Sequence, residues 1–401
     1  MSDLEDFRTR ARAWLAEQAP TYGKEARRGL TEAEDLALGR RYMAAKHDAG
    51  FAGIAFSKDI GGQGLSGLHK IAFDAEEMAY GMPAVYFGIS LGMPVPILIH
   101  YGQDREWVKE RVTKALRGEE IWCQLFSEPS GGSDLAALRT KAEPEGNGWK
   151  LNGQKVWTSW AQYADYGVIV ARSDPGVAKH KGLTYFWVDM KAPGVQVRPI
   201  KLAGGDSHVN EVFFDDVKLT DGQRMGEVGG GFGVALHTLM IERYIATSSS
   251  GFGPHLDLFV DLAKEVEVNE RPAIEDGRVR QAIARNYAMR SGLDAITARA
   301  HKMMMQGMQP GPEGSLQKLF AVRSRQKLSE MAVDLQGAAG LGFDPHGFAN
   351  EDWTLSWLNA PTGRIAGGSD EVLLNTIAEK ILGLPQDYRP DKGVPFSQIP
   401  A

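Results

Sequence analysis

The stretch from Trp122 to Asp134 reads WCQLFSEPSGGSD, a short apolar strand that breaks into a polar, glycine-rich turn. Glycine in such a turn lets backbone N–H groups approach a ligand closely, and the hydroxyl groups of Ser127 and Ser133 offer directed hydrogen bonds. Turn statistics alone favour an ordinary turn by about three to one. The stretch therefore indicates a ligand site only in combination with other segments.

A second stretch, from Leu151 to Ser159, reads LNGQKVWTS. Its Asn-Gly pair predicts a hairpin turn, and the strand that follows ends on Trp157 beside hydroxyl groups. An aromatic side chain next to hydrogen-bond donors suits a flat heteroaromatic ligand. The alternative is a hairpin with a core tryptophan, which this segment alone favours.

Hydrophobic periodicity on either side of these stretches divides the chain into parts. Helical spacing predicts an N-terminal α-helical domain over 1–119 and a C-terminal helical part over 230–385. Short runs of β-branched and aromatic residues predict a middle β domain over 120–229. A proline-rich extended tail over 386–401 is expected to be poorly ordered or to lie across a neighbouring molecule. The clearest strands are expected at Tyr166–Ala171, Leu183–Val188 and Asn210–Phe214, and helices at Phe232–Ser250, His255–Val266, Val279–Gln306, Ser315–Leu335 and Glu371–Leu382.

Composition narrows the class of protein. The formal net charge of −6 over 401 residues gives no general basic field for nucleic acid. The single cysteine, Cys123, excludes an internal disulfide and a multi-cysteine metal site. No export signal and no membrane span are readable, so we expect a cytoplasmic protein.

The two stretches, in this order and separation, resemble the acyl-CoA dehydrogenase family, whose flavin-binding strands read like TEPxAGSD and KxWITN. The resemblance implies an α+β fold with a helical N-terminal domain, a middle β-barrel or sandwich and a C-terminal four-helix bundle. It also implies FAD-dependent removal of two hydrogens across the α and β carbons of an acyl-CoA thioester. Similar segments elsewhere are DIGGQGL at 59–65, EVFFDDV at 211–217, GAAG at 337–340 and AEKILG at 378–383.

The resemblance also implies a cofactor site. Ser159 falls next to the N5 edge of the flavin, and Gly132 and Ser133 fall where flavin and thioester meet. The family's RxxFG arginine has no clear counterpart in NERPAI at 269–274, so either Arg271 replaces it or a different second subunit does. The expected FAD contacts are Gln124, Phe126, Ser127, Gly132, Ser133, Trp157, Ser159, Arg271, Gly337, Ala338, Gly340, Ser369 and Glu371.

The reaction needs a carboxylate that takes the α proton. In the family's commonest branch it belongs to a late YEGT motif, but Gly367 stands in that place here. In the branch of isovaleryl-CoA and long-chain dehydrogenases it lies on an earlier helix in an ER context, which matches Glu242 and Arg243. Glu242 is therefore the candidate base, and Ser133, Arg243 and Gly367 are candidate substrate contacts. A solvated or structural Glu242–Arg243 pair is the simpler alternative, and Asp370 and Glu371 are weaker candidate bases.

Three functions remain open on this scaffold. The first is a dehydrogenase that passes electrons to an electron-transferring flavoprotein, in fatty acid or side-chain β-oxidation. The second is a flavin oxidase or monooxygenase, whose members typically lack both glutamates. The third is a non-catalytic subunit of a heteromeric enzyme. The family implies a homotetramer built as a dimer of dimers, with a heterotetramer as the alternative. The small apolar segment 88–94 indicates either room for a bulky acyl chain or ordinary helix packing.

Overall fold

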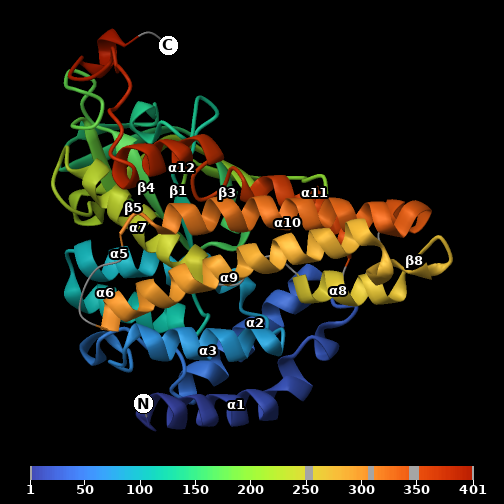
Figure 1. The fold of residues 1–401 in the computed structure, drawn as a ribbon. Coiled ribbons are helices and arrows are strands. Elements are labelled where there is room, and N and C mark those ends of the chain that lie inside the picture. The colour runs from blue at the N-terminus through green and yellow to red at the C-terminus, as the bar shows by residue number, and fades with distance from the viewer. Residues whose placement is uncertain (1, 249–255, 306–310, 343–351, 400–401) are drawn as a thin grey trace. The chain divides into compact units, whose positions relative to one another are not determined.

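The computed structural model describes residues 2–248, 256–305, 311–342 and 352–399, with the backbone alone at residues 2, 241–248, 301, 304 and 305 (Figure 1). The chain forms two compact units, and helix α7, Gly231–Ser248, contains the division between them. Unit 1 comprises Met1–Lys201, Ser207–Glu242 and Tyr388–Ala401, and unit 2 comprises Leu202–Asp206 and Arg243–Asp387.

The N-terminal part of unit 1 is helical, as its periodicity predicts. Thr31 begins the second helix with a capping box: its hydroxyl accepts from the Glu34 N–H, and the Glu34 carboxylate accepts from the Thr31 N–H at 2.8 Å. Pro94 occupies the first turn of α5, where a missing N–H costs nothing. The helices are α1 (Ser2–Tyr22), α2 (Glu32–Asp48), α3 (Gly67–Ala79), α4 (Val85–Gly92), α5 (Pro94–Tyr101) and α6 (Arg105–Leu116).

A seven-stranded sheet follows these helices. Its strand order is β1-β4-β2-β3-β7-β6, and β5 pairs with β4. Strand β4 runs parallel to β1 and to one end of β2, and the other pairings are antiparallel. The three strands expected from the sequence correspond to β4, β5 and β7. The strands are β1 (Trp122–Leu125), β2 (Lys141–Glu145), β3 (Gly148–Ser159), β4 (Tyr166–Arg172), β5 (Leu183–Asp189), β6 (Val195–Ile200) and β7 (Val209–Thr220).

The predicted hairpin at the Asn-Gly pair is wrong. Asn152 and Gly153 lie inside β3, at a register shift against β7, and the turn between β2 and β3 lies at Gly146, which has a φ of 58°. Gly153 serves close approach instead, because a Cβ there would stand 2.5 Å from the Thr140 hydroxyl. The Asn-Gly pair therefore marks a β-bulge here. A hairpin turn and a β-bulge both favour residues without a bulky side chain, so the pair alone does not distinguish them.

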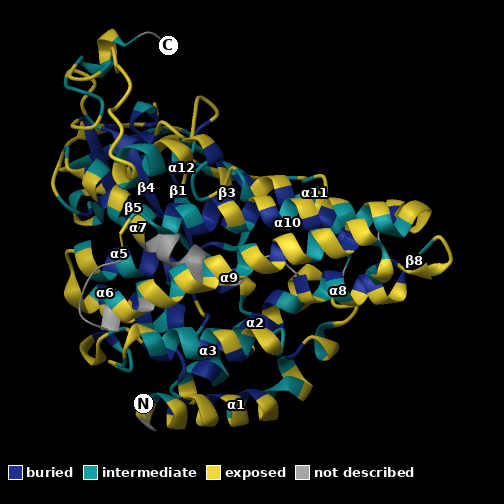
Figure 2. Ribbon diagram, viewed as in Figure 1, coloured by how far each residue is buried: buried dark blue, intermediate teal, exposed yellow. Residues whose placement is uncertain are grey.

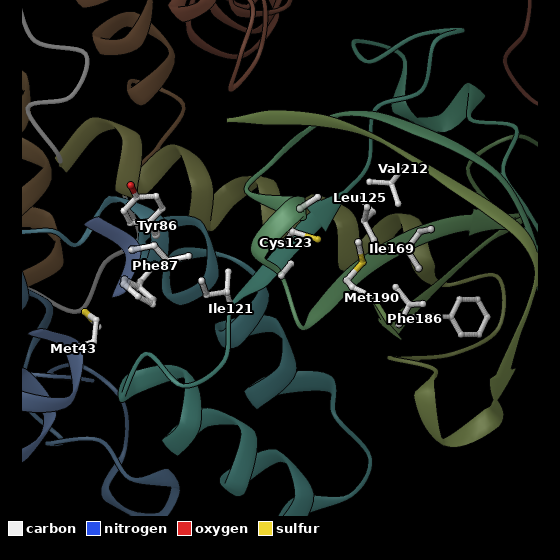
Figure 3. Close-up of a cluster of buried hydrophobic side chains, with 14 of the residues drawn as sticks. Met43, Tyr86, Phe87, Ile121, Cys123, Leu125, Ile169, Phe186, Met190 and Val212 are labelled. Atoms are coloured by element: carbon white, nitrogen blue, oxygen red, sulfur yellow. The ribbon is translucent and has the colours of Figure 1, made fainter. Parts of the chain in front are cut away.

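One hydrophobic core joins the helices of unit 1 to the sheet. Met43 and Phe87 from α2 and α4 belong to the same buried cluster as Ile121, Cys123 and Leu125 (Figure 3). Burial raises the pKa of the Cys123 thiol, so this cysteine acts as a small apolar side chain. Successive side chains of β1 alternate between the two faces of the sheet. Gln124, which lies between Cys123 and Leu125, therefore points away from this cluster.

Unit 2 is a set of helices around its own core. Phe259, Leu262, Leu328 and Trp353 are buried together there, and exposed residues recur along α9 (Figure 2). Helix α11 was not expected from the sequence; the Asp352 side chain begins it by accepting from the Leu355 N–H at 2.8 Å. The helices are α8 (Leu256–Glu265), α9 (Gly277–Met305), α10 (Gly314–Gln336), α11 (Trp353–Gly363) and α12 (Asp370–Thr376); β8 (Glu267–Val268) and β9 (Arg271–Pro272) form a small hairpin.

The predicted fold class is confirmed, because helical N- and C-terminal parts enclose a central sheet in the chain order. Residues 388–399 of the tail belong to unit 1 and donate backbone hydrogen bonds to its residues 175 and 177. Within the described ranges, the longest helices are too polar to cross a bilayer. The same ranges bring no three candidate metal ligands together.

Candidate functional site

The two stretches that decided the sequence interpretation lie side by side in unit 1. The Val156 N–H donates to the Ser127 carbonyl at 2.9 Å. Glu128 and Gly131 exchange two backbone hydrogen bonds of 3.1 and 2.9 Å, which closes the glycine-rich turn. A Cβ at Gly132 would lie 2.9 Å from the Ser127 hydroxyl, so a larger residue there would displace that hydroxyl. The exposed turn residues, Ser133 among them, are therefore held next to β3.

A buried ion pair that the sequence analysis missed connects the same two segments. Lys155 Nζ donates to the Glu128 carboxylate at 2.7 Å, to the Phe126 carbonyl at 3.0 Å and to the Val170 carbonyl at 2.9 Å. These three bonds use all three ammonium donors. Glu128 also accepts the N–H groups that begin the next segment, at residues 139 and 140, at 2.6 and 2.9 Å. Glu128 and Lys155 each lie inside one of the two motif stretches. An acid and a base in these mostly apolar or neutral stretches are the sequence feature that could have indicated the pair.

The electrostatics of the pair follow from burial. Burial alone disfavours the Glu128 carboxylate, but Lys155 and the donated hydrogen bonds outweigh it, so the pKa of Glu128 lies below its ordinary value. Burial lowers the pKa of Lys155 although Glu128 opposes the shift. Neither charge reaches solvent. The pair therefore positions backbone rather than exchanging protons with a ligand.

Trp157 combines exposure with an unusual backbone. Its φ is 62°, and 58% of its surface is exposed, at the register shift of β3 against β7 between Lys155 and Thr158. A non-glycine residue in the left-handed region costs roughly 1–3 kcal/mol and is typical of functional sites. The expectation of a core tryptophan is wrong, because the bulge turns the indole outward. Ser159, two residues on, is half-buried.

The residues of β1 supply a test of whether a flavin fits. Gln124 Oε1 is buried and has no hydrogen-bond partner in the described part of the chain. An unpaired buried acceptor is costly unless a ligand supplies a donor, and an isoalloxazine ring carries such an N–H group. Phe126, two residues after Gln124 and just past the end of β1, is buried in a cluster of apolar residues. An unpaired amide oxygen, a glycine-lined turn and an exposed indole fit a flat heteroaromatic cofactor.

In unit 2, five candidates lie on two separate segments, the turn before α12 and the glycine-rich end of α10, and the turn also contains Gly367. Gly367 and Gly368 have φ angles of 69° and 100°, and Lys318 of α10 donates to the Gly368 carbonyl at 2.6 Å. Ser369 caps α12 by accepting from the Val372 N–H at 3.4 Å, and Glu371 is exposed. These residues form one turn against the N-terminal half of α10.

Asp370 is ill suited to act as a base. It is 2% exposed, and its Oδ2 accepts from Arg323 Nε at 2.9 Å and from Arg364 Nη2 at 2.6 Å. Burial opposes ionisation, but the two guanidinium groups outweigh it and hold the pKa of Asp370 below its ordinary value. A carboxylate engaged by two arginines accepts a further proton poorly.

The glycine-rich segment at the end of α10 lies far from that turn. Gly337 ends the helix with a φ of 55°, and Ala338 beside it is exposed. Gly340 is buried, and its carbonyl accepts from the Thr354 hydroxyl at 2.7 Å. Fourteen helical residues separate Arg323, at the Asp370 cluster, from Gly337, so the two candidate groups stand roughly 20 Å apart along α10.

Three further candidates have different standings. Arg271 is exposed on the β8–β9 hairpin, whose turn residues Asn269 and Glu270 have φ angles of 52° and 62°. Glu242 and Arg243 belong to α7, but their side chains lie outside the described residues.

The small apolar segment at 88–94 packs against the sheet. Ser90 is 1% exposed and accepts from the Trp122 N–H at 3.1 Å. Gly88, in contrast, is exposed, and a Cβ there would meet nothing within 4 Å. Helix packing explains the buried face of α4, and Gly88 leaves open space on the other face.

Known proteins share this organisation. Models of three acyl-CoA dehydrogenase domains match the chain: the N-terminal domain at residues 1–119, the middle domain at 123–217 and the C-terminal domain at 229–382. Acyl-CoA dehydrogenase IpdE1 of Mycolicibacterium smegmatis is 34% identical over 97% of this chain and 100% of its own length. Acyl-CoA dehydrogenase FadE34 of Mycobacterium tuberculosis is 36% identical over 81% of this chain, which spans 44% of that protein.

Solved structures agree on the fold. The ChsE4–ChsE5 complex from Mycobacterium tuberculosis contains a chain that superposes with a TM-score of 0.81 at 24% identity, over 96% of this chain and 99% of that one. The curated relatives are named acyl-CoA dehydrogenases, which are oxidoreductases that act on CH–CH groups and depend on FAD. The chain therefore belongs to the acyl-CoA dehydrogenase family.

Proposed function

We propose that this chain binds FAD and oxidises an acyl-CoA thioester to the trans-2-enoyl-CoA. The observation that carries the proposal is the hydrogen bond from Val156 N–H to the Ser127 carbonyl, which brings the two motif segments together. Family membership supplies the reaction class. The named residues supply the site, because an adjacent indole, amide and glycine turn match what the ring of a flavin requires.

We assign a part in holding the cofactor to the candidate site residues of unit 1. Gln124 offers its unpaired carbonyl oxygen to a ring N–H, and Trp157 offers an exposed aromatic face. Ser127 and Ser159 donate hydroxyl hydrogen bonds to ring oxygens and nitrogens, and Gly132 with Ser133 leaves room for the thioester. When bound, FAD supplies the acceptor for the hydride that leaves the β carbon.

Glu242 takes the α proton in this proposal. It is the carboxylate that matches the family's earlier position, and Gly367 leaves the later position without one. The competing acid Asp370 is committed to Arg323 and Arg364. Proton removal by Glu242 and hydride loss from the β carbon together leave the double bond, and electrons pass on to an electron-transferring flavoprotein.

The roughly 20 Å between the Gly337–Gly340 segment and the Ser369 turn bears on assembly. We propose that the Gly337–Gly340 segment completes a neighbour's pyrophosphate site in a dimer of dimers. Exposed Arg271 would extend to the same neighbour. The neighbour is a second copy of this chain in the simplest case, and a related chain in the manner of the ChsE4–ChsE5 complex is the alternative.

One experiment separates the possible functions. The purified protein, reconstituted with FAD, is expected to be yellow and to bleach when acyl-CoA is added without oxygen; oxygen uptake is expected to stay low, and electron-transferring flavoprotein to restore the colour. Rapid oxygen consumption would instead identify an oxidase, and a folded, colourless protein a non-catalytic subunit. A panel of linear, branched and polycyclic acyl-CoAs then ranks substrates.

A further inference from the structure

The C-terminal segment Tyr388–Ile399, here called the strap, lies along the loop between β4 and β5. The Phe396 N–H donates to the Val177 carbonyl at 2.8 Å, and the Ser397 N–H donates to the Pro175 carbonyl at 2.9 Å. A β-bridge pairs Pro395 with Ala178. These backbone contacts give the strap a defined register on the chain's own middle part.

Phe396 connects the strap to the segment after the glycine-rich turn. Its ring centroid lies 3.7 Å from the guanidinium carbon of Arg172, which is 3% exposed. Arg172 donates to the carbonyls of Ala136 and Leu138, the latter at 3.2 Å, and to the Lys179 carbonyl at 2.7 Å. A cation over an aromatic ring is held more strongly when it is desolvated than when it is exposed. The Phe396 ring therefore covers the Arg172 side chain, which binds the carbonyls of residues 136 and 138.

A second connection reaches the other end of that segment. Lys179 Nζ lies 2.6 Å from Asp134 Oδ2 and also pairs with the Asp391 carboxylate of the strap. The Lys179 side chain is 12% exposed, so this bridge is partly shielded from solvent screening. Asp134 directly follows the exposed residues Gly132 and Ser133.

We propose that the strap positions the Gly131–Asp134 turn, with Phe396 and Asp391 as positioning residues that act through Arg172 and Lys179. The two connections grip the segment on both sides, at Asp134 and at residues 136–138. The backbone of the turn is held by the Glu128–Gly131 pair at one end and by the Ala137 N–H, which donates to the Asp134 carbonyl at 2.9 Å, at the other; the glycines between them do not restrict the backbone. Contacts from the far end of the chain therefore supply the rigidity that a binding turn needs.

The functional part of this inference rests on the proposed function, since the turn is where flavin and thioester are expected to meet. A turn that samples more conformations binds the thioester less well before it affects the chemical step. Loss of a strap contact is therefore expected to raise KM for acyl-CoA several-fold and to change kcat by less than about twofold.

The first test does not depend on activity. Hydrogen–deuterium exchange is followed at residues 134–140 in the full-length protein and in Phe396→Leu, Asp391→Asn and a variant that ends at Asp387. Each variant is expected to exchange roughly tenfold faster there, because the lost strap contact lowers the free energy of local opening at these residues. Phe396→Tyr and Asp391→Glu keep the ring and the charge and are expected to restore slow exchange. Lys392→Ala, an exposed strap residue, is the matched control.

The outcomes separate this inference from the proposed function. Unchanged exchange at residues 134–140 in both point variants overturns the strap, whether or not the protein binds FAD; a truncated variant that fails to fold leaves the point variants to decide. Faster exchange in the point variants, together with a wild-type protein that binds no flavin, upholds the strap and contradicts the proposed function. Faster exchange with an unchanged KM overturns the positioning role and reduces the strap to a stabilising contact.

Discussion

Lys155 and Glu128 form a salt bridge of 2.7 Å with 0% and 4% of their side chains exposed. Lys155 lies in β3 and Glu128 begins the glycine-rich turn. The salt bridge therefore connects the two segments of the candidate flavin site inside the protein. A buried pair of this kind adds little stability over an apolar pair of the same size, because both charges lose hydration. Removing one partner, however, leaves a buried charge uncompensated.

Lys155→Met is therefore expected to destabilise the protein by about 3–5 kcal/mol, since it strands the Glu128 carboxylate. Adding Glu128→Gln to it is expected to recover part of that loss, because the stranded charge is gone. Thermal unfolding of the two single variants and the double variant measures the coupling. A double variant as unstable as the sum of both single variants would contradict the pairing.

Trp157 offers a separation of stability from binding. Trp157→Gly is expected to keep or raise the melting temperature of the FAD-free protein, because glycine adopts a φ of 62° without strain. The same change is expected to weaken FAD binding about tenfold or more through the lost aromatic contact. Fluorescence titration with FAD measures the affinity, and Trp157→Phe, which keeps a ring and the strain, is the control. Equal affinity in all three proteins would rule out a flavin contact.

The sequence predicted those features that rest on local pattern. Helical periodicity located the long helices of unit 2, and β-branched runs located β4, β5 and β7. The resemblance assigned both motif segments to one cofactor site, and in the structure the hydrogen bond from the Val156 N–H to the Ser127 carbonyl joins them. Helix α11 was missed, since TLSWLNAPTG combines strand-forming residues, a proline and a glycine, and Asp352 and tertiary packing outweigh its weak propensity.

Contacts between distant residues could not be predicted in this way. The Asn-Gly pair indicated a turn, yet Thr140 packs against Gly153 and makes it a bulge. Nothing in the spacing pairs Glu128 with Lys155, or Phe396 with Arg172, which lie 27 and 224 positions apart (155 − 128 and 396 − 172). Such contacts depend on sheet register, which a single sequence leaves open.

Acid should weaken the Asp370 cluster in unit 2. The pKa of Asp370 is depressed, so its ion pairs with Arg323 and Arg364 contribute stability that is present above the unfolded carboxyl value of about 3.9. That stability is lost as the pH falls through the lower folded value. Asp370→Asn is expected to cost about 1–2 kcal/mol at pH 7, less than the loss of a fully buried pair because the Arg323 and Arg364 side chains are 43% and 40% exposed, and the cost is expected to shrink as Asp370 is protonated. Melting temperatures from pH 7 to pH 3 measure the difference between the two proteins, with exposed Asp334→Asn as control; a difference as large at pH 3 as at pH 7 would contradict the assignment.

Assembly can be tested by mass. A chain of 43.8 kDa that completes a neighbour's cofactor site should elute as a tetramer, with FAD bound. Arg271→Ala is expected to leave the fold of unit 2 unchanged, because the side chain is exposed, and to lower FAD affinity. Light scattering and FAD titration measure the two effects. A monomer that retains FAD and activity would refute the shared site.

The base assignment has the sharpest consequence. Glu242→Gln is expected to keep FAD and acyl-CoA binding, because glutamine has nearly the same shape, and to slow flavin reduction at least about 100-fold, the usual cost of losing a general base. Stopped-flow bleaching under anaerobic conditions measures the reduction step directly. Glu227→Gln, at an exposed acid shortly before α7, is the matched control and should reduce at the normal rate.

A carboxylate moved to the family's other position gives the complementary measurement. Gly367→Glu in the Glu242→Gln background is expected to restore only a small part of the rate, because the φ of 69° at Gly367 costs a side chain roughly 1–2 kcal/mol and a displacement near 1 Å costs as much as the missing base. The single variant therefore decides the assignment. Near-normal flavin reduction in Glu242→Gln, with binding intact, would transfer the base to Glu371 or to a partner subunit, because Asp370 is held by Arg323 and Arg364.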